Sequence, residues 1–431
     1  MIFMIASVTQ QGNEIIFKFE MQESDIEHLD NSKIKMAKDV ASVRLDNLKL
    51  SDIHPDLIGL STILMSHQFI GKEIHLPMKV SNNFFGMVNG VLSRYKIKSE
   101  IDEKLEGIIP IKNNKPALSF SGGADSMAAL AVMPGNTVPI FLNRPMSEFS
   151  IYNSDAPLET CKKLREVGYD VIVVDCDLEF LRQPIGFPSD LAHAVPAILL
   201  SRKMEFDSLS FGTVLESAFG IGHNKYINYA KGSHWRFYST LLSAVGLQLS
   251  LPISGISEVG TGIIMKSSPL GKWSQSCIRG KFKIPCKNCW KCFRKELLSL
   301  ALEPVKDVNI KKMMTSKEVQ IRLSEYPISH ENVIKFSINN ININNYPVLK
   351  NLEYRVSYDS NINFLSKWYG PSIQFIPEGW RLECIEKIRI FLNKMNAEEE
   401  NLVKNWDMTE FLEEKLVRNA HSKLTSSWQD I

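Results

Sequence analysis

The stretch ALSFSGGADSMAAL (residues 117–130) contains the turn that decides the fold. Its apolar run LSF predicts a buried strand, and the sequence from Ser126 to Met133 predicts a helix. The two glycines between them let the backbone turn tightly, with no Cβ to block an approaching ligand. The helix that follows would present free N–H groups and the positive end of its dipole. The stretch therefore predicts an anion-binding turn between a strand and a helix.

Strands and helices continue to alternate after this turn. Further strands are expected at 136–143, 170–178 and 207–213, with helices at 156–166 and 191–204. This alternation predicts an α/β fold built on a doubly wound parallel sheet. Such sheets bind ligands beyond the carboxyl ends of their strands, so the turn would lie at the ligand-binding edge.

The chain of 431 residues is long enough for two or three domains. Residues 1–105 are expected to form an N-terminal α+β region that begins with two strands around Gly12. Residues 106–300 would form the α/β domain, and residues 301–431 a C-terminal accessory, largely helical region. Within that last region, the Asn- and Ile-rich segment 335–349 has the composition of a strand.

The composition is that of an ordinary globular protein, with 44% hydrophobic and 23% charged residues. The formal net charge of +2 gives no strong field that would attract nucleic acid or a membrane, so neither partner is expected. The first residues lack the basic start and the cleavage site of a signal peptide. A cytoplasmic protein is therefore expected.

The polar residues of the turn indicate which anion it binds. Ser121 and Ser126 can donate hydroxyl hydrogen bonds, whereas Asp125 would repel a bare phosphate and is expected to hold a magnesium ion that bridges phosphates. The turn has no lysine, unlike a Walker A loop. This combination suits a nucleotide cleaved between its α- and β-phosphates, with the turn holding the pyrophosphate that leaves. The alternative is a glycine-rich turn that only starts a helix.

Ser121-Gly122-Gly123-Ala124-Asp125-Ser126 resembles the signature of the PP-loop ATP pyrophosphatases. The resemblance implies adenylation of a carboxylate, carbonyl or carboxamide-like oxygen with release of pyrophosphate, ATP and Mg²⁺ being required. It implies that Asp125 and Ser126 are catalytic and that adenine sits by the end of the second strand. The implied ATP-binding residues are Ser119, Phe120, Ser121, Gly122, Gly123, Ala124, Asp125, Ser126, Leu142, Asn143 and Gly212.

A second motif, Cys277-x8-Cys286-x2-Cys289-x2-Cys292, contains four of the seven cysteines. Four thiolates at such spacings can close a tetrahedron around zinc. Lys287, Lys291, Arg294 and Lys295 would offset the negative charge of the thiolates. An iron–sulfur cluster is the rival interpretation, and zinc is preferred because a closed set of four thiolates leaves no iron position open for chemistry.

Together the two motifs resemble the QueC family of 7-cyano-7-deazaguanine synthases over roughly residues 115–300. The resemblance implies that a small-molecule carboxylate, 7-carboxy-7-deazaguanine, is activated by adenylation. Ammonia would then give an amide, and a second round would give the nitrile. The zinc site would be structural.

The chain departs from that family in the wall of the pocket. The stretch 194–199 lacks the expected arginine and asparagine, and 212–216 has lost an asparagine but keeps Glu216. Arg236, with His234 nearby, falls near the place of another missing motif. Glu216 and Arg236 are therefore candidate substrate contacts. The changed pocket and the added terminal regions resemble the branch found in bacterial anti-phage operons, which implies a protein substrate or operon partner and a deazaguanine joined to a protein amino terminus.

Two further functions stay open at the level of the sequence. One is a sulfur-transfer enzyme of the same superfamily acting on a nucleobase or tRNA, which would require a sulfur-carrying cysteine; Cys161 and Cys176 are expected to be core residues instead. The other is a non-catalytic nucleotide-binding scaffold. In either enzymatic case Lys266, Arg279 and Lys281 are candidates for neutralising pyrophosphate.

Overall fold

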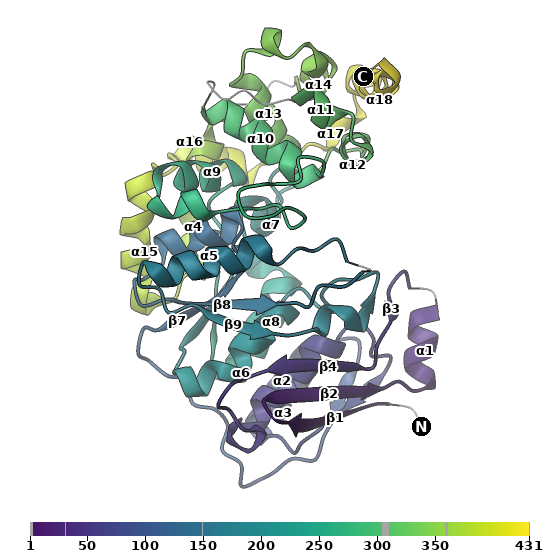
Figure 1. Ribbon diagram of the computed structural model, residues 1–431, viewed down its shortest axis with the longest axis vertical. Helices are drawn as coiled ribbons and strands as arrows, with labels where there is room; N and C mark the ends of the chain where they lie inside the picture. The colour runs from purple at the N-terminus through teal and green to yellow at the C-terminus, as the bar shows by residue number, and fades with distance from the viewer. Residues whose placement is uncertain (1–2, 31, 149, 304–309, 358–360, 431) are drawn as a thin grey trace.

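The computed structural model describes residues 3–30, 32–148, 150–303, 310–357 and 361–430 (Figure 1). Figure 1 shows an N-terminal sheet at one end of the long axis, a central sheet in the middle and a group of helices at the other end. Among the residues described, no helix has both the length and the apolar character needed to pass through a membrane.

The central sheet has five strands, all parallel, in the order β12-β11-β7-β8-β9. These strands are β7 Pro116–Phe120, β8 Val138–Asn143, β9 Ile172–Asp175, β11 Ser208–Ser210 and β12 Gln248–Ser250. The prediction of an α/β fold with a parallel sheet is confirmed. The strand β12 was not predicted from the sequence, although leucines alternate there with Gln248 and Ser250, because the run is only five residues long.

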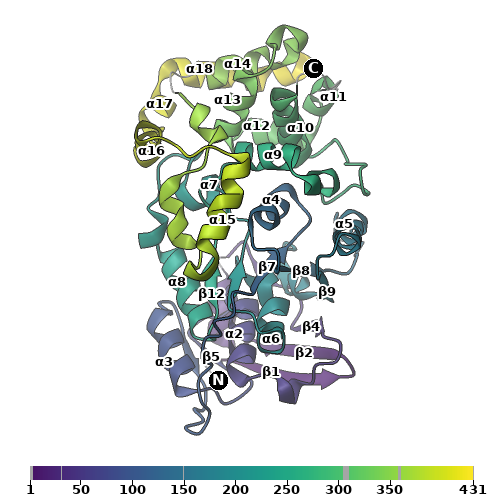
Figure 2. The same cartoon turned by 90° about the vertical axis from the view of Figure 1, so that its left-hand side faces the viewer.

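Helices cover both faces of this sheet (Figure 2), because neighbouring residues along a strand point to opposite faces. Ala117 and Ile140 join one apolar core, whereas Leu118 and Phe141 join another. The first face packs against α6 Val195–Met204 and α8 Ser233–Ser243, and the second against α4 Ala124–Val132, α5 Asp155–Glu166, α9 Glu258–Ser267 and α15 Glu378–Phe391. The helices predicted at 126–133, 156–166 and 191–204 are thus present, with shifted ends.

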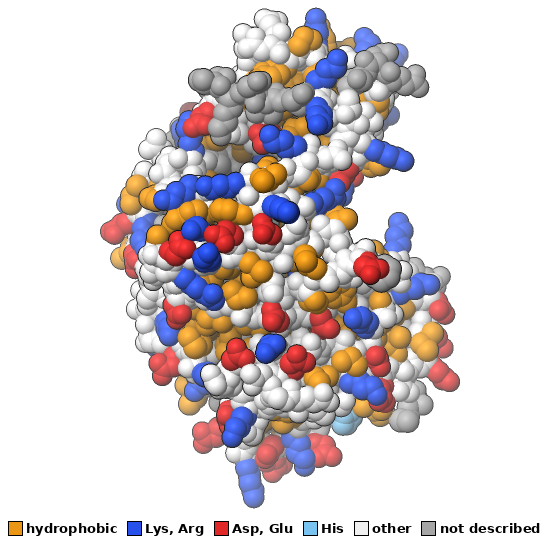
Figure 3. Space-filling model, viewed as in Figure 1, with side chains coloured by type: hydrophobic (Ala, Val, Ile, Leu, Met, Phe, Trp, Pro, Cys, Tyr) orange, Lys and Arg blue, Asp and Glu red, His pale blue; other side chains and the backbone are white. Residues whose placement is uncertain are grey.

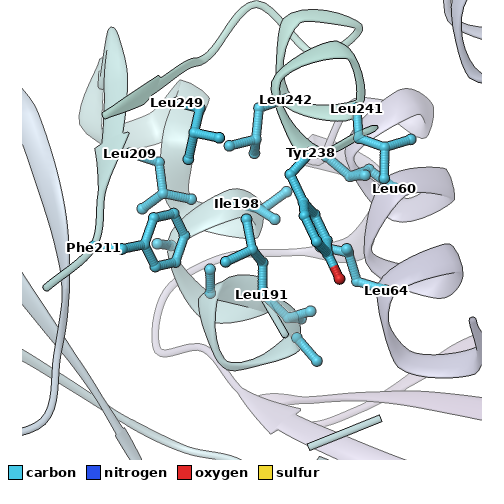
Figure 4. Packing of buried hydrophobic residues seen from close by; sticks show 14 of the residues in the cluster. Leu60, Leu64, Leu191, Ile198, Leu209, Phe211, Tyr238, Leu241, Leu242 and Leu249 are labelled. Atoms are coloured by element: carbon cyan, nitrogen blue, oxygen red, sulfur yellow. The ribbon is translucent and has the colours of Figure 1, made fainter. Parts of the chain in front are cut away.

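Figure 4 shows the core between the sheet and the helices of the first face. Phe211, directly after β11, lies beside Ile198 of α6, and Tyr238 of α8 reaches toward Leu64 of the N-terminal region. The core of the central sheet therefore continues into the N-terminal region.

The N-terminal region contains a second five-stranded sheet, in the order β4-β2-β1-β5-β6. Strands β1 and β2 form the expected antiparallel hairpin around Gly12, whose φ is +58°. The strands are β1 Met4–Gln11, β2 Glu14–Glu20, β4 Val40–Arg44, β5 Glu73–His75 and β6 Lys96–Lys98, and the helices are α1 Glu23–Asp30, α2 Pro55–Ser66 and α3 Asn82–Val91. Helix α2 is buried against α6. A two-stranded pairing of β3 Lys35–Met36 with β10 Arg182–Gln183 adds a further connection to the central part.

The C-terminal residues form helices that pack against one another and against the central sheet. Their bounds are α10 Trp290–Leu302, α11 Ile310–Met314, α12 Lys317–Leu323, α13 Glu331–Asn339, α14 Lys350–Val356, α16 Ala397–Lys404, α17 Thr409–Glu413 and α18 Lys415–Ser426. The strand expected at 335–349 is wrong, since α13 and two short 3₁₀ turns occupy this segment. The segment begins as a helix because Ile334 and Ile338 bury their side chains in one cluster with Phe293 and Leu297 of α10, and such packing overrides the β preference of isoleucine.

Charged side chains of both signs are interspersed over the face shown in Figure 3. This distribution agrees with the small net charge of the chain.

Candidate active site

The glycine loop, residues 121–126, joins β7 to α4 at the carboxyl edge of the central sheet. Gly122 adopts a φ of +73°, a conformation that favours glycine, and Gly123 is the N-cap of α4. A third glycine, Gly212, lies against the loop from the end of β11. A Cβ on Gly212 would stand 3.0 Å from the backbone nitrogen of Ser126, so a side chain there would require the backbone of the loop to shift by a few tenths of an ångström.

The two serine hydroxyls of the glycine loop lie together. Ser121 Oγ is 3.0 Å from Ser126 Oγ, and Ser126 Oγ donates to the carbonyl oxygen of Gly123 at 3.1 Å. The backbone N–H of Ala124 donates to Ser276 Oγ at 3.1 Å, which ties the loop to the segment before the cysteine cluster. Both hydroxyls are thus held at the first turn of α4, where its dipole favours an anion.

A cavity of about 700 Å³ opens over the glycine loop and the end of β11. Ser121, Asp125 and Ser126 form one wall, and Phe211 and Gly212 form part of its floor. Its lining includes Ser119, Phe120, Ser121, Asp125, Ser126 and Gly212 from the sequence-predicted site, together with Asp190, Leu191, His193, Thr213, Tyr229, Ser233 and His234. Such a volume is typical of small-molecule sites.

A second wall of this cavity carries three hydrogen-bonded side chains. His234 Nε2 lies 3.1 Å from Asp190 Oδ2, and His234 Nδ1 lies 2.8 Å from the hydroxyl of Tyr229. Of these three, only His234 was named from the sequence. Asp190 was missed because it lies 44 residues from His234 in the sequence. Tyr229 is close to His234 in the sequence but belongs to no recognised motif. The fold brings all three side chains to one wall of the cavity.

Asp125 faces two partners on different helices. Its Oδ1 accepts a hydrogen bond from the Thr261 hydroxyl of α9 at 3.0 Å, and Lys295 Nζ of α10 lies 3.5 Å from the same oxygen. Burial alone would lower the pKa of Lys295, but Asp125 and Glu258 raise it above its ordinary value. Lys295 therefore brings a positive charge to a loop that has none of its own.

Ionisable side chains also cluster around the buried carboxylate of Glu258, next to Lys295. Glu258 is 3.2 Å from Lys295 Nζ and 2.9 Å from Arg294, with His330 at 3.5 Å. Burial would raise the pKa of Glu258, but Lys295, Arg294 and His330 together hold it below its ordinary value. Glu258 is therefore ionised, and it anchors both cations of α10.

Glu216 lies in the same buried region and not at the cavity. Its carboxylate accepts hydrogen bonds from the backbone N–H of Glu258 at 3.1 Å and from Asn332 Nδ2 at 3.0 Å. Burial, and next the charge of Glu258, raises the pKa of Glu216 to about 7. Through these contacts Glu216 joins α7 Leu215–Phe219 to α9 and α13.

The Sγ atoms of Cys277, Cys286, Cys289 and Cys292 all lie within 4.8 Å of one another. Cys286 Sγ and Cys292 Sγ are 3.8 Å apart, and a tetrahedron with Zn–S bonds of about 2.3 Å has edges of about 3.8 Å. Thiolates that each bind a different iron of a cluster would stand further apart. The cluster is therefore compatible with a single tetrahedral ion such as zinc.

The cysteine cluster and the glycine loop are connected through α10. Cys289 is the N-cap of this helix, and Cys292 and Lys295 follow within its first two turns. A second cavity, of about 670 Å³, is lined by Ala124, Ser276, Cys277, Cys292 and Lys295. A metal bound by the cysteines would thus hold α10 in position. It would thereby also hold Lys295 beside Asp125.

Other residues predicted from the sequence lie elsewhere. The predicted residues that are not part of the lining of the 700 Å³ cavity are Gly122, Gly123, Ala124, Leu142, Asn143, Glu216 and Arg236. Asn143 Nδ2 donates to Asp175 at 2.7 Å, and Arg236 is exposed on α8.

Lys266 and Arg279, which were predicted to neutralise pyrophosphate, form contacts with other groups. Lys266 binds the carbonyl oxygen of Leu302 at 2.7 Å, and Arg279 pairs with Glu318 at 2.7 Å. Lys295 is the cation that reaches Asp125. The sequence places Lys295 three residues after Cys292, but no spacing in the sequence relates it to Asp125.

Comparison with known families gives a match over the part of the chain that contains the cysteine cluster. Residues 238–407, less than half of the chain, match the profile of a family of unknown function (DUF6395). The match begins within α8 and ends before α17, so it does not include the glycine loop. No curated protein and no solved structure matches the chain.

Proposed function

We propose that this protein is an ATP-dependent ligase that adenylates a carboxylate and releases pyrophosphate. The observation that carries the proposal is the glycine loop at the wall of a 700 Å³ cavity, with Ser121, Asp125 and Ser126 facing the cavity at the start of α4. The cavity has room for a nucleotide phosphate chain and a small acid together. The absence of a lysine within the loop favours cleavage between the α- and β-phosphates.

The residues of the loop have distinct tasks in this proposal. The hydroxyl of Ser121, and that of Ser126 once it rotates away from the carbonyl oxygen of Gly123, would donate to the departing pyrophosphate, and the first turn of α4 favours its charge. Asp125 would hold Mg²⁺, which lowers the electrostatic cost of bringing phosphates together. Lys295, 3.5 Å from Asp125 Oδ1, supplies positive charge at the same place.

The carboxylate is 7-carboxy-7-deazaguanine or a similar acid, a proposal supported by the resemblance of the two motifs to the QueC family. An amine then attacks the activated acid to give an amide, from which a second round would give a nitrile. The changed pocket wall supports a protein amino terminus as an acceptor in anti-phage defence.

The four-cysteine cluster would hold zinc in a structural role. Its closed set of thiolates lies outside the 700 Å³ cavity, and it lies at the start of the helix that carries Arg294 and Lys295. In this arrangement the metal acts on the reaction only by holding α10 in place.

Sulfur transfer has less support than ligation. None of the seven cysteines, all in the described part of the chain, lines the 700 Å³ cavity. Burial raises the pKa of the Cys161 and Cys384 thiols to about 12, so neither is a ready nucleophile.

The proposal is tested by ATP–pyrophosphate exchange, with 7-carboxy-7-deazaguanine as the acid. Wild-type protein should exchange label only when acid, ATP and Mg²⁺ are all present. Asp125→Asn and Ser126→Ala should each lose about 10²-fold or more, because each removes a group that binds the pyrophosphate end.

Asp30→Asn is the matched control, since Asp30 is exposed at the end of α1, and it should exchange like wild type. Unchanged exchange in Asp125→Asn, or exchange that does not depend on the acid, would contradict the proposal.

A further inference from the structure

The wall formed by Asp190, His234 and Tyr229 is not used by the adenylation step. The three residues come from separate places in the chain: Asp190 precedes a 3₁₀ turn before α6, Tyr229 begins the 3₁₀ turn Tyr229–Lys231, and His234 lies in the first turn of α8. All three line the same 700 Å³ cavity as Ser121 and Asp125. The wall therefore faces the place where the activated acid would form.

The hydroxyl of Tyr229 is held in one position. Its ring is buried and meets the ring of Phe375 edge-on at 5.5 Å, with Trp235 at 6.0 Å. Its oxygen lies 2.8 Å from His234 Nδ1. A buried ring with a hydrogen-bonded hydroxyl at a cavity wall can present its remaining lone pair to a ligand.

The hydrogen bonds among the three groups define a path for one proton. The hydrogen bond from His234 holds the pKa of Asp190 below its ordinary value, so this carboxylate accepts the proton on Nε2. In an imidazole whose proton is on Nε2, Nδ1 is an acceptor and the Tyr229 hydroxyl is the donor. Burial raises the pKa of Tyr229, so it remains a neutral phenol. The set is poised to pass one proton from the cavity to His234.

We infer that this wall binds an amine acceptor and removes its proton as it attacks the acyl adenylate, an inference that rests on the proposed function. The amine nitrogen forms a bond to the acyl carbon, and the carbon–oxygen bond to AMP breaks, with AMP taking the electron pair. One nitrogen proton moves to Tyr229 Oη, and the phenolic proton moves to His234 Nδ1. Asp190 stabilises the imidazolium that results.

In this inference Tyr229 is the catalytic residue, because it touches the reacting nitrogen, and His234 and Asp190 act through it. An acceptor that is a weak nucleophile and must lose a proton needs such a relay. Hydroxylamine is a much stronger nucleophile and needs it far less. The two acceptors therefore separate a role in proton transfer from a role in building the cavity.

The test uses the full chain with ATP, Mg²⁺ and 7-carboxy-7-deazaguanine, and compares ammonium with hydroxylamine as acceptor. Tyr229→Phe should reduce amide formation from ammonium by about 10²-fold or more. It should keep pyrophosphate exchange and hydroxamate formation close to wild type. His234→Gln should show the same split, and Tyr354→Phe, which alters an exposed tyrosine on α14, should resemble wild type in all three assays.

Two results would overturn the inference. One is amide formation from ammonium that is unchanged in Tyr229→Phe; the other is an equal loss of exchange, amide and hydroxamate in that variant, which would assign Tyr229 to the ATP site or to folding. Failure of wild-type protein to exchange pyrophosphate would instead contradict the proposed function with this acid, so the two failures are distinguishable.

Discussion

At the scale of single residues, the glycine loop packs closely against the backbone of Gly212, where a side chain would be crowded. In Gly212→Ala the new Cβ would stand 3.0 Å from Ser126 N and 3.1 Å from the carbonyl carbon of Asp125. Because both neighbours are backbone atoms, the first turn of α4 must move. We expect pyrophosphate exchange to fall about tenfold or more, since small displacements of positioned groups are costly in catalysis.

The control for this change is Gly86→Ala in α3, where a Cβ meets nothing within 4 Å. It should raise stability by about 0.5–1 kcal/mol and leave exchange intact, because alanine favours a helix interior. Equal exchange in the Gly212 and Gly86 variants would show that the loop does not need its close contact with β11.

Glu216 makes the stability of the fold depend on pH. Its folded-state pKa of about 7 lies above the ordinary 4.5, so the folded state binds more protons between these values. Stability should therefore fall as the pH rises from about 4.5 to about 7. Glu216→Gln keeps an oxygen to accept from Glu258 N and Asn332 but cannot ionise, so it should be more stable than wild type at pH 8, by at most about 3 kcal/mol.

Urea unfolding at pH 4.5 and pH 8 measures this difference, which should be small at the lower pH. Glu386→Gln, at an exposed site on α15, should show no pH-dependent gain. A Glu216→Gln difference that is equal at both pH values would mean that Glu216 does not titrate as the burial of its carboxyl requires.

At the scale of elements, α15 joins the C-terminal residues to the central sheet, beside α4 and α9 (Figure 2). Trp380 is 3% exposed in the core on that face of the sheet, whereas Leu382 on the same helix is 74% exposed. Trp380→Ala should destabilise the protein by about 3–5 kcal/mol, and Leu382→Ala by less than about 0.5 kcal/mol. Denaturant unfolding measures both, and similar values for the two variants would contradict the packing of α15.

Helix α10 is the element through which the metal site should act. Cys292→Ser should lower bound zinc from about one ion per chain to nearly none. It should also lower pyrophosphate exchange, because Arg294 and Lys295 lose the support that places them beside Glu258 and Asp125.

Elemental analysis measures the metal, and Cys161→Ala, which changes a cysteine outside the cluster, should keep its zinc. Iron in place of zinc, or full exchange in metal-free Cys292→Ser, would contradict the structural role of the cluster.

The elements that could be predicted from the sequence are those with local signals. The strand–glycine–helix passage at 117–130, the hairpin around Gly12 and the cysteine spacing each depend on neighbouring residues. The segment 335–349 could not be predicted, because α13 gains its stability from burial beside α10. The short β12 strand pairs with β11, and the alternation of leucine with Gln248 and Ser250 is a local signal for it that was not used.

At the scale of the whole molecule, the candidate site combines residues that are distant in the chain. Asp125 from the glycine loop meets Lys295 from α10, and His234 contacts Tyr229 through Nδ1 and Asp190 through Nε2. The sequence could predict the loop and the cluster separately but not these pairs, because no spacing rule relates residues brought together only by the sheet. For the same reason, the residues predicted from the sequence to neutralise pyrophosphate were Lys266, Arg279 and Lys281, and Lys295 was not among them.

The transfer of oxygen from the acid to the nucleotide tests the central claim most directly. Wild-type protein would be given 7-carboxy-7-deazaguanine labelled with ¹⁸O in its carboxylate, together with ATP, Mg²⁺ and ammonium, and the products would be weighed by mass spectrometry. Adenylation predicts one labelled oxygen in each AMP formed and none in pyrophosphate. Label in inorganic phosphate with ADP as the nucleotide product, or AMP without label, would contradict the account.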